Sequence, residues 1–274
     1  MRSLLFAPAH KPNIVQRALS GSTGADRIVV DLEDGVPDAE RPVAVATLTG
    51  LEPGAPQGTP ALCRIRAADQ GGDDDLPLVG ARFCGVMLAK AESPADVAGV
   101  RRWLTGRGRA IELWLLIETA RGLLRLDEML AAAPVDGVMF GAGDMQADLR
   151  LGDDVRQLDA ARSRIVFSCI AAGVRNIVDT PEAQLRPGAG YLASARSARG
   201  LGFTAKAAIH PAQLPAIHQV FGPSAAEIDR ATAVLAMPDG ASRDGAAMVD
   251  EATKRWARGI LASIGTDEEN NHGA

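Results

Sequence analysis

The stretch ELWLLIE, residues 112–118, decides the fold. Its apolar run, residues 113–117, lies between two glutamates and shows no alternation of polar and apolar positions. Such a run is typical of a parallel strand covered by helices on both faces. Because Glu118 follows directly, the carboxyl end of this strand is expected to carry a carboxylate.

Seven similar runs accompany this one, and segments of helical period separate them. Counting the first, the predicted strands are residues 3–7, 27–32, 61–65, 85–89, 112–117, 137–140, 174–178 and 206–209. The predicted helices are residues 12–19, a helix capped by Ser93, and residues 120–132, 154–172, 190–201 and 211–220. Strands that alternate with helices form βαβ units and a parallel sheet. Eight such repeats over about 220 residues predict an α/β fold of the (β/α)8 TIM barrel type.

A doubly wound open sheet is the alternative fold. Such sheets commonly carry a glycine-rich phosphate turn after the first strand. Here APAH, residues 7–10, follows the first run, and the chain has no GxGxxG or Walker motif. These absences favour the barrel.

The pattern changes after Phe221. Helices are predicted at residues 224–236 and 248–264, with turns at 238–240 and 244–245. We therefore expect a catalytic barrel over residues 1–221 and a helical extension over 222–266 that acts as a lid or oligomer arm. The polar residues 267–274 are expected to form a disordered tail.

The composition excludes several classes of protein. The 274 residues are 47% hydrophobic and 23% charged, which is ordinary for a globular protein. A net charge of -5 argues against nucleic-acid binding through bulk positive charge. No apolar run approaches the roughly 20 residues of a membrane helix. The three cysteines stand singly among apolar residues, as buried free thiols do in a reducing compartment. We expect a soluble cytoplasmic protein without nucleic-acid or membrane partners.

Ionisable side chains stand at the ends of nearly all the predicted strands. They are Asp31, Glu33 and Asp34, then Arg64 and Arg66, Lys90, Glu118, Asp144, Asp179 and His210. Barrel enzymes place their chemistry at the carboxyl ends of the strands. The sequence therefore predicts an active site at this end, although His210 could instead cap the last barrel helix.

Glu118 and Asp144 are the candidate metal ligands. Glu118 ends a run expected in the core, where a carboxylate is costly unless it is paired or binds a metal. Asp144 follows a Gly-x-Gly turn, whose small Gly143 lets a ligand approach. Two carboxylates from adjacent strands suit Mg²⁺, which keeps several waters. A salt bridge from Glu118 to Lys90 or Arg121 is the alternative.

Arg64 is the candidate substrate clamp. It lies two residues from Arg66 on a predicted strand, so both side chains are expected on one face. An arginine that points into the barrel can bind a carboxylate through two parallel hydrogen bonds. A structural pair with Asp31, Glu33 or Asp34 is the alternative.

Five segments, in order, resemble the citrate lyase beta-subunit-like branch of the HpcH/HpaI aldolase family. They are RSLLFAP (2–8), DLEDGV (31–36), IETARG (117–122), FGAGDMQADL (140–149) and LGFTAKAAIHP (201–211). The resemblance implies a barrel that binds Mg²⁺, or alternatively Mn²⁺, through Glu118 and Asp144. It also implies that Arg64 binds substrate and polarises a carbonyl, with Glu33, Asp34, Lys90 and Gly143 as further substrate- or cofactor-binding residues.

The reaction implied is cleavage or formation of a carbon–carbon bond in a 3-hydroxyacyl thioester, usually of coenzyme A. Family members split citryl, malyl or citramalyl thioesters into an acyl thioester and a 2-oxo acid. A homo-oligomer, favoured as a trimer, is implied as well. Positive charge for the coenzyme A phosphates is expected from Arg2, Lys11, Arg17 and Lys90.

MVD, residues 248–250, resembles the family's lid segment, whose aspartate transfers a proton in a neighbouring subunit's site. Asp250 is therefore the second predicted catalytic residue, and a surface aspartate that opens the final helix is the alternative. The chain departs from the family pattern after Asp250, after Asp179 and at Arg66. These departures lie near the expected substrate entrance, so the resemblance implies no single substrate. Three other functions stay open: a free-acid 4-hydroxy-2-oxo acid aldolase, a beta subunit acting on an acyl-carrier-protein thioester, and a non-catalytic thioester-binding barrel.

Overall fold

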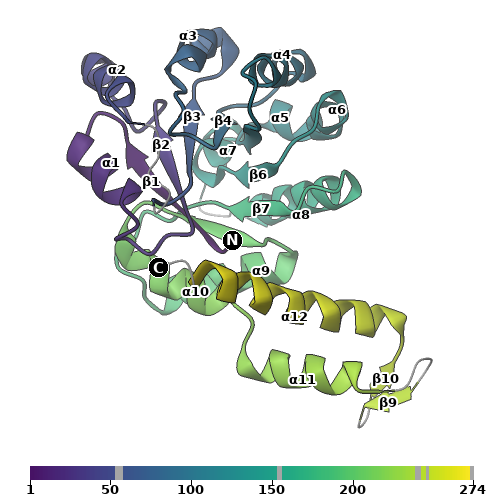
Figure 1. The fold of residues 1–274 in the computed structure, drawn as a ribbon. Coiled ribbons are helices and arrows are strands. Elements are labelled where there is room, and N and C mark those ends of the chain that lie inside the picture. Colours follow the sequence, from purple (N-terminus) through teal and green to yellow (C-terminus); the bar gives the residue numbers. More distant parts are fainter. Residues whose placement is uncertain (53–57, 153–155, 238–241, 245–246, 272–274) are drawn as a thin grey trace. The chain divides into compact units, whose positions relative to one another are not determined.

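Eight parallel strands close into a barrel in the computed structural model, which describes residues 1–52, 58–152, 156–237, 242–244 and 247–271 (Figure 1). The strands are β1 (Ser3–Pro8), β2 (Arg27–Asp31), β3 (Ala61–Ile65), β4 (Gly85–Leu88), β5 (Glu112–Ile117), β6 (Gly137–Phe140), β7 (Asn176–Asp179) and β8 (Ala205–Ala208). Each strand pairs with the next along the chain, and β1 pairs with β8, which closes the sheet. The predicted TIM barrel is confirmed.

Helices follow the strands and cover the outside of the barrel in Figure 1. They are α1 (Pro12–Leu19), α2 (Arg41–Thr49), α3 (Gly72–Asp75), α4 (Pro94–Thr105), α5 (Ala120–Leu124), α6 (Leu126–Ala132), α7 (Ala142–Asp148), α8 (Arg156–Ala171), α9 (Ala189–Leu201) and α10 (Leu214–Phe221). Local signals set several of their starts. Ser93 accepts a hydrogen bond from the Asp96 amide and caps α4, and proline stands in the first turn of α1 and α4.

The single helix predicted over residues 120–132 is instead two helices. Arg125 separates α5 from α6 with a non-helical backbone at φ -102°, ψ 8°. Its guanidinium donates to the backbone oxygen of Glu92, 3.2 Å away, and to the Glu128 carboxylate. These contacts with residues beyond α5 hold the break, so the helical period of the sequence could not reveal it.

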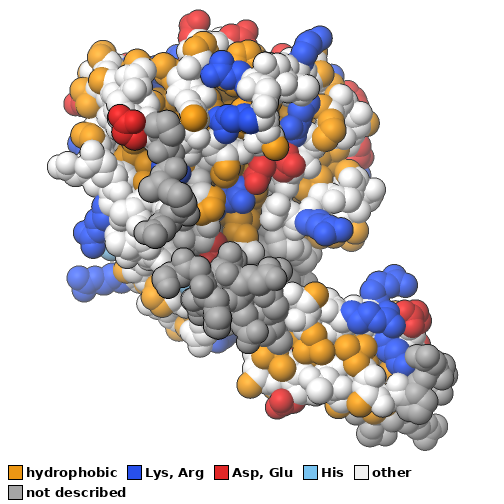
Figure 2. All heavy atoms as spheres, viewed as in Figure 1, with side chains coloured by type: hydrophobic (Ala, Val, Ile, Leu, Met, Phe, Trp, Pro, Cys, Tyr) orange, Lys and Arg blue, Asp and Glu red, His pale blue; other side chains and the backbone are white. Residues whose placement is uncertain are grey.

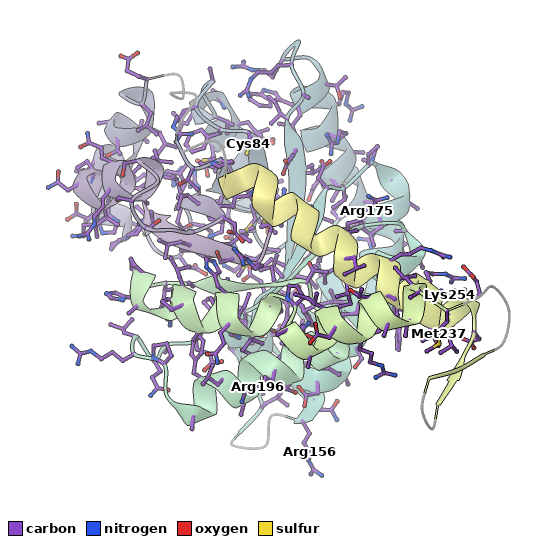
Figure 3. The ribbon with its side chains drawn as sticks, turned by 60° about the horizontal axis from the view of Figure 1, so that its bottom comes forward. Cys84, Arg156, Arg175, Arg196, Met237 and Lys254 are labelled. Atoms are coloured by element: carbon purple, nitrogen blue, oxygen red, sulfur yellow. The ribbon has the colours of Figure 1, made fainter. Side chains whose placement is uncertain are left out.

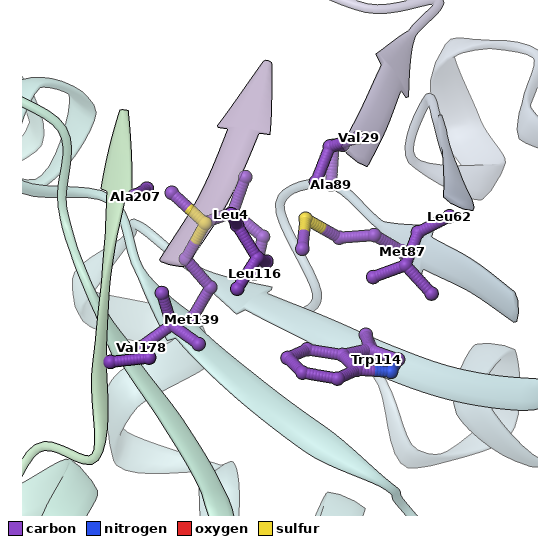
Figure 4. Packing of buried hydrophobic residues seen from close by; sticks show 11 residues of the cluster. Leu4, Val29, Leu62, Met87, Ala89, Trp114, Leu116, Met139, Val178 and Ala207 are labelled. Carbon is purple, nitrogen blue, oxygen red and sulfur yellow. The ribbon is translucent and has the colours of Figure 1, made fainter. Parts of the chain in front are cut away.

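The barrel is filled by side chains that alternate along its strands. Leu4, Val29, Leu62, Met87, Trp114, Leu116, Met139 and Val178 belong to one buried cluster with alanines of β8 and Ala89 (Figure 4). Because side chains of a strand alternate between its two faces, the residue two positions further along also points inward. The next inward layer is therefore expected at the carboxyl end of the strands.

The chain divides into two compact units, residues 1–219 and 220–274. The second contains α11 (Ala225–Leu235), the antiparallel pair β9 (Ser242–Asp244) and β10 (Ala247–Val249), and α12 (Glu251–Asn271). Ala231, Val234, Val249 and Ala257 form its core. The ammonium of Lys254 donates to the backbone oxygen of Met237 at 3.0 Å, and Figure 3 shows these two residues side by side.

Two expectations for this unit differ from the structure. The helix predicted to start at Met248 starts at Glu251 instead, because Met248 and Val249 pair with β9. Helix α12 also continues to Asn271, into the predicted tail 267–274. Glutamate is a good helix former, so this polar stretch can extend a helix already begun. Residues 272–274 and the turn predicted at 238–240 lie outside the described residues, as does Gly245 of the other turn.

All three cysteines are free thiols, as the sequence predicts. Within the described ranges, no helix is both long and apolar enough to cross a membrane.

Candidate active site

Three charged side chains point into the barrel at the carboxyl ends of their strands. Asp31 lies two residues after Val29, Arg64 two after Leu62, and Glu118 two after Leu116. Alternation along the strands therefore turns all three side chains towards the barrel axis. All three are buried.

Asp31 and Arg64 form a two-pronged ion pair. The strand register places them opposite one another on β2 and β3. Nε and Nη2 of Arg64 donate to the two Asp31 carboxylate oxygens, at 2.6 Å each. The backbone amides of Glu33 and Gly35 donate to the same carboxylate at 2.9 Å. Burial alone would lower the pKa of Arg64, but its bonds to Asp31 raise it, so the guanidinium stays charged.

Glu33 and Lys90 extend this ion pair. Glu33 lies 3.0 Å from Nη1 of Arg64. The Lys90 ammonium bonds Glu33 and is 3.1 Å from the carboxylate of Asp34. Arg64 therefore forms the structural pair considered as the alternative, with Asp31 and Glu33, and it also lines the central cavity.

Glu118 is 2% exposed and has a different kind of partner. Its Oε1 accepts one hydrogen bond of 2.9 Å from the Lys90 backbone amide. Lys90 adopts a left-handed conformation with φ 46°. The salt bridge considered for Glu118 is not formed in the described part of the chain, since the Lys90 ammonium bonds Glu33 and Asp34, and Arg121 faces Glu92 at 3.7 Å.

Burial raises the pKa of Glu118 to about 8. The positive charge of Arg64 lowers it, whereas the charges of Glu33 and Asp144 raise it further. The neutral form of this carboxyl is therefore favoured near pH 7, and a bound cation would favour the ionised form.

Asp144 stands in the first turn of α7, directly after β6. Gly141 precedes this helix, and a Cβ there would lie 2.6 Å from Oε2 of Glu118. Only glycine therefore leaves room for the Glu118 carboxylate beside the start of α7. The amide of Ala142 donates to Thr180 Oγ1 at 3.2 Å, which ties α7 to the residue after β7.

One cavity of about 460 Å³ joins these groups. Its charged lining residues are Asp31, Arg64, Glu118 and Asp144. The other lining residues are Phe6, Pro8, Gly35, Leu116, Met139, Gly141, Gly143, Thr180, Pro181 and Ile209. The Arg64 guanidinium also lies 5.2 Å from the centre of the Phe6 ring. In Figure 2, acidic and basic side chains lie beside hydrophobic ones near the middle of the barrel unit.

The chemistry of the cavity fits a magnesium ion. No group of three or more acidic, histidine or cysteine side chains with metal-binding geometry occurs among the described residues. Mg²⁺ needs no such group, because it is commonly held by one or two carboxylates and keeps several waters. Glu118 and Asp144 supply two carboxylates in one cavity, and a divalent ion would stabilise the ionised form of buried Glu118.

Lys90, Glu33 and Asp34 were expected to bind substrate or cofactor, and they do not line this cavity. Lys90 borders a smaller cavity of about 250 Å³. This position follows from the alternation of side chains along the strand. Met87 and Ala89 point into the barrel, so Lys90, the next residue, is expected to point away from its interior.

Arg66, Asp179 and His210 lie outside the cavity as well. Arg66 follows the end of β3 and pairs with Asp75. Asp179 is fully buried and pairs with Lys206 at 2.7 Å. His210 Nδ1 accepts a hydrogen bond from the Ala212 amide and caps the turn at Pro211–Gln213, which confirms its capping alternative.

The sequence analysis did not select Phe6 and Thr180 for the site, although both line the cavity. Phe6 lies two residues after Leu4, and Thr180 two after Val178, both in the inner cluster. Both could have been identified from the sequence, by taking the residue two positions beyond each inward-pointing apolar side chain.

Asp250 belongs to the second compact unit, where it caps α12. Its Oδ1 accepts hydrogen bonds of 2.9 Å from the amide and the hydroxyl of Thr253. The hydrogen bond from the backbone amide of Thr253 holds the pKa of this exposed carboxyl below its usual range. These contacts fit the alternative expectation for Asp250, a surface aspartate at the start of the last helix.

Comparisons with known proteins agree with the fold. The model of the HpcH/HpaI aldolase/citrate lyase family matches residues 2–211. A citrate lyase subunit beta-like protein of Mycobacterium tuberculosis is 35% identical over 243 residues, covering 85% of this chain and 83% of the relative. The (3S)-malyl-CoA thioesterase of Cereibacter sphaeroides is 31% identical, covering 91% and 87%. Human mitochondrial citramalyl-CoA lyase is 30% identical, covering 86% and 75%.

A similar solved structure is that of CitE from Mycobacterium tuberculosis in complex with magnesium, acetoacetate and coenzyme A. Its TM-score is 0.81 at 30% identity, covering 96% of this chain and 98% of CitE. The relatives thus include proteins named as lyases and as thioesterases of coenzyme A esters. On the family match and on these identities, the chain belongs to the HpcH/HpaI aldolase/citrate lyase family.

Proposed function

We propose that this protein is a Mg²⁺-dependent carbon–carbon lyase. It splits a 3-hydroxyacyl-CoA thioester into an acyl-CoA and a 2-oxo acid, or joins the two in the reverse direction. The observation that carries the proposal is the convergence of Glu118, Asp144 and Arg64 on one cavity at the carboxyl end of the barrel.

Glu118 and Asp144 would hold the metal. When bound, the ion supplies Lewis-acid polarisation of the carbonyl of the 2-oxo acid. Gly141 keeps the space beside Glu118 clear, and the amide of Lys90 fixes the orientation of its carboxylate.

Arg64 would stabilise the oxygen that becomes negative when the carbon–carbon bond breaks. Nε and Nη2 of Arg64 each donate one hydrogen bond to Asp31, and Nη1 lies 3.0 Å from Glu33, so each terminal nitrogen would keep an N–H for the substrate. Such donors suit the carboxylate or the developing alkoxide of the substrate. Because Asp31 and Glu33 hold the guanidinium in advance, little reorganisation is needed during the reaction.

A second cavity of about 650 Å³ offers room for coenzyme A. It shares Phe6, Pro8 and Ile209 with the first cavity, and Arg17 lines its wall. Of the basic residues expected to bind phosphates, Lys90 already bonds Glu33 and Asp34, and Arg2 lies 3.7 Å from Asp26. We therefore assign the phosphate contacts to Arg17 and the nearby exposed Lys11.

Asp250 would transfer the proton to or from the methyl carbon of the acyl thioester, in the site of a neighbouring subunit of a homo-oligomer. The test mixes Asp250→Ala with Glu118→Ala, each inactive alone. If the site is shared, subunit exchange restores part of the activity, because some mixed sites contain both intact residues. No recovery after verified exchange would contradict the shared site.

The deciding experiment is a substrate panel. Purified protein with Mg²⁺ is incubated with malyl-, citramalyl- and citryl-CoA and with free 4-hydroxy-2-oxo acids, and products are separated by chromatography. An acyl-CoA together with a 2-oxo acid supports the lyase. Free coenzyme A together with the intact hydroxy acid would indicate thioester hydrolysis instead, and turnover of free acids alone would indicate the free-acid aldolase.

A further inference from the structure

The cavity is poor in positive charge. Arg64 is the only cation among its described lining residues, and Asp31 and Glu33 already neutralise it. In the cavity and the ion-pair network around it, the carboxylates of Asp31, Glu33, Asp34, Glu118 and Asp144 face only the cations of Arg64 and Lys90. A divalent ion would offset only part of this excess of negative charge.

Two neighbouring cations, Lys206 and Arg162, do not relieve the shortage. Lys206 is fully buried, and its ammonium bonds Asp179 and the backbone oxygen of Thr180. Arg162 donates to the same Asp179 carboxylate at 2.8 Å. Neither residue lines the cavity.

The deep wall of the cavity is apolar. Leu116 and Met139 are register partners on β5 and β6, and both belong to the inner cluster (Figure 4). Both also line the cavity, together with Phe6 and Ile209. A carboxylate against this wall would lose its hydration without gaining a cation, which is strongly unfavourable.

Resting on the proposed function, we infer that the 2-oxo acid handled by this site is a monocarboxylic acid with a small apolar substituent. Its one carboxylate has two partners, the metal and the free N–H groups of Arg64. Its substituent packs against Leu116 and Met139. A second carboxylate on the 2-oxo acid, as in oxaloacetate, has no partner in the described cavity.

The test compares two 2-oxo acids of equal chain length. 2-Oxobutanoate and freshly dissolved oxaloacetate differ only in a terminal methyl against a terminal carboxylate. Binding of each to the full-length protein is measured by titration calorimetry at one fixed concentration of free Mg²⁺. We expect 2-oxobutanoate to bind at least about tenfold more tightly, since tenfold corresponds to 1.4 kcal/mol and an unpaired buried carboxylate costs more than that.

Two variants of Met139 test whether the apolar wall causes the preference for 2-oxobutanoate over oxaloacetate. Met139→Lys adds a cation to the wall and should narrow or reverse the ratio of the two dissociation constants. Met139→Leu, the matched control, should leave the ratio within about twofold, because the wall stays apolar. The wild-type ratio tests the inference even if Met139→Lys does not fold.

The outcomes separate this inference from the proposed function. Oxaloacetate binding as tightly as 2-oxobutanoate, or more tightly, would overturn the monocarboxylic preference and leave the lyase intact. Failure of both acids to bind with Mg²⁺ would overturn the inference together with the lyase proposal on which it rests.

Discussion

Two clusters of charged residues lie at the strand ends of this barrel, and they differ in how their buried carboxylates are paired. In the first, fully buried Asp179 receives one hydrogen bond from Lys206 and one from Arg162, so each carboxylate oxygen has its own cation. In the second, the carboxylates of Asp31, Glu33, Glu118 and Asp144 outnumber the cations of Arg64 and Lys90, and all of these carboxylates except that of Glu33 line a cavity. The first cluster is closed and stabilises the fold, whereas the second is open and suits a ligand.

The phase of the strands explains this difference. Asp31, Arg64 and Glu118 continue the inward phase of their strands, whereas Asp179 and Lys206 are one residue out of phase with Val178 and Ala207. A shift of one residue moves a side chain from the barrel interior to the layer between strands and helices. In this barrel, a charged residue at a strand end therefore belongs to the candidate site only when its side chain points into the barrel.

The largest effect is expected from replacing Glu118 and Asp144, the proposed metal ligands of the open cluster. Glu118→Gln and Asp144→Asn should each lower kcat by about 10³-fold or more, because Lewis-acid catalysis contributes several kcal/mol. Mg²⁺ affinity, measured by calorimetry, should fall in both variants. Asp148→Asn, at the far end of the same helix, is the matched control. Unchanged Mg²⁺ affinity in both ligand variants would show that these residues do not hold the metal.

The next effect concerns the geometry of Arg64. Arg64→Lys keeps the charge but loses the planar fork that Asp31 holds, so kcat should fall by about 10²- to 10³-fold. Arg66→Lys, two residues away on an ion pair outside the cavity, should stay within about threefold. Steady-state kinetics with the productive thioester measures both. A larger loss in Arg66→Lys would reverse the roles assigned to the two arginines.

In the closed cluster we expect an effect on stability. Lys206→Met leaves Asp179 buried with Arg162 as its remaining cation, so the free energy of unfolding should fall by about 3 kcal/mol. The double variant Lys206→Met/Asp179→Asn removes the buried charge and should regain part of this loss. Urea unfolding at pH 7 measures both proteins. A double variant no more stable than the single one would show that Lys206 does not stabilise the buried charge of Asp179.

The smallest effect is a pH dependence of the metal-free protein. Burial raises the pKa of Glu118 to about 8, against 4.5 in the unfolded chain, so between these values the folded protein holds a proton that the unfolded chain has released. Stability should therefore fall as the pH rises through this window, by at most about 1.4 kcal/mol per pH unit, and level off above pH 8.

Glu118→Gln cannot titrate and isolates this contribution. Urea unfolding in EDTA at pH 5.5, 7 and 8.5 would be compared between the two proteins. The difference between their free energies of unfolding should change with pH in the direction given above. A constant difference would mean that Glu118 is ionised in the folded metal-free protein.

Sequence alone determined the barrel and selected Glu118 and Asp144 as the candidate metal ligands. The alternation of apolar runs with helical segments is local information, and the strands at residues 61–65, 112–117 and 137–140 start and end where the sequence predicts. Glu118 was identifiable because it directly follows a strand that must be buried, and Asp144 because it follows a Gly-x-Gly turn after another such strand. The family motifs added the reaction class, which the residue pattern by itself did not specify.

Only the tertiary structure decided which charges pair and which face the cavity. Asp31 and Arg64 are 33 positions apart, and the register of β2 against β3 brings them together. The left-handed backbone of Lys90, the break at Arg125 and the pair formed by β9 and β10 likewise depend on contacts or conformations without a local sequence signature. Apolar periodicity reports burial within one element, whereas ion pairing depends on the alignment of separate elements, and that alignment is fixed only when the barrel closes.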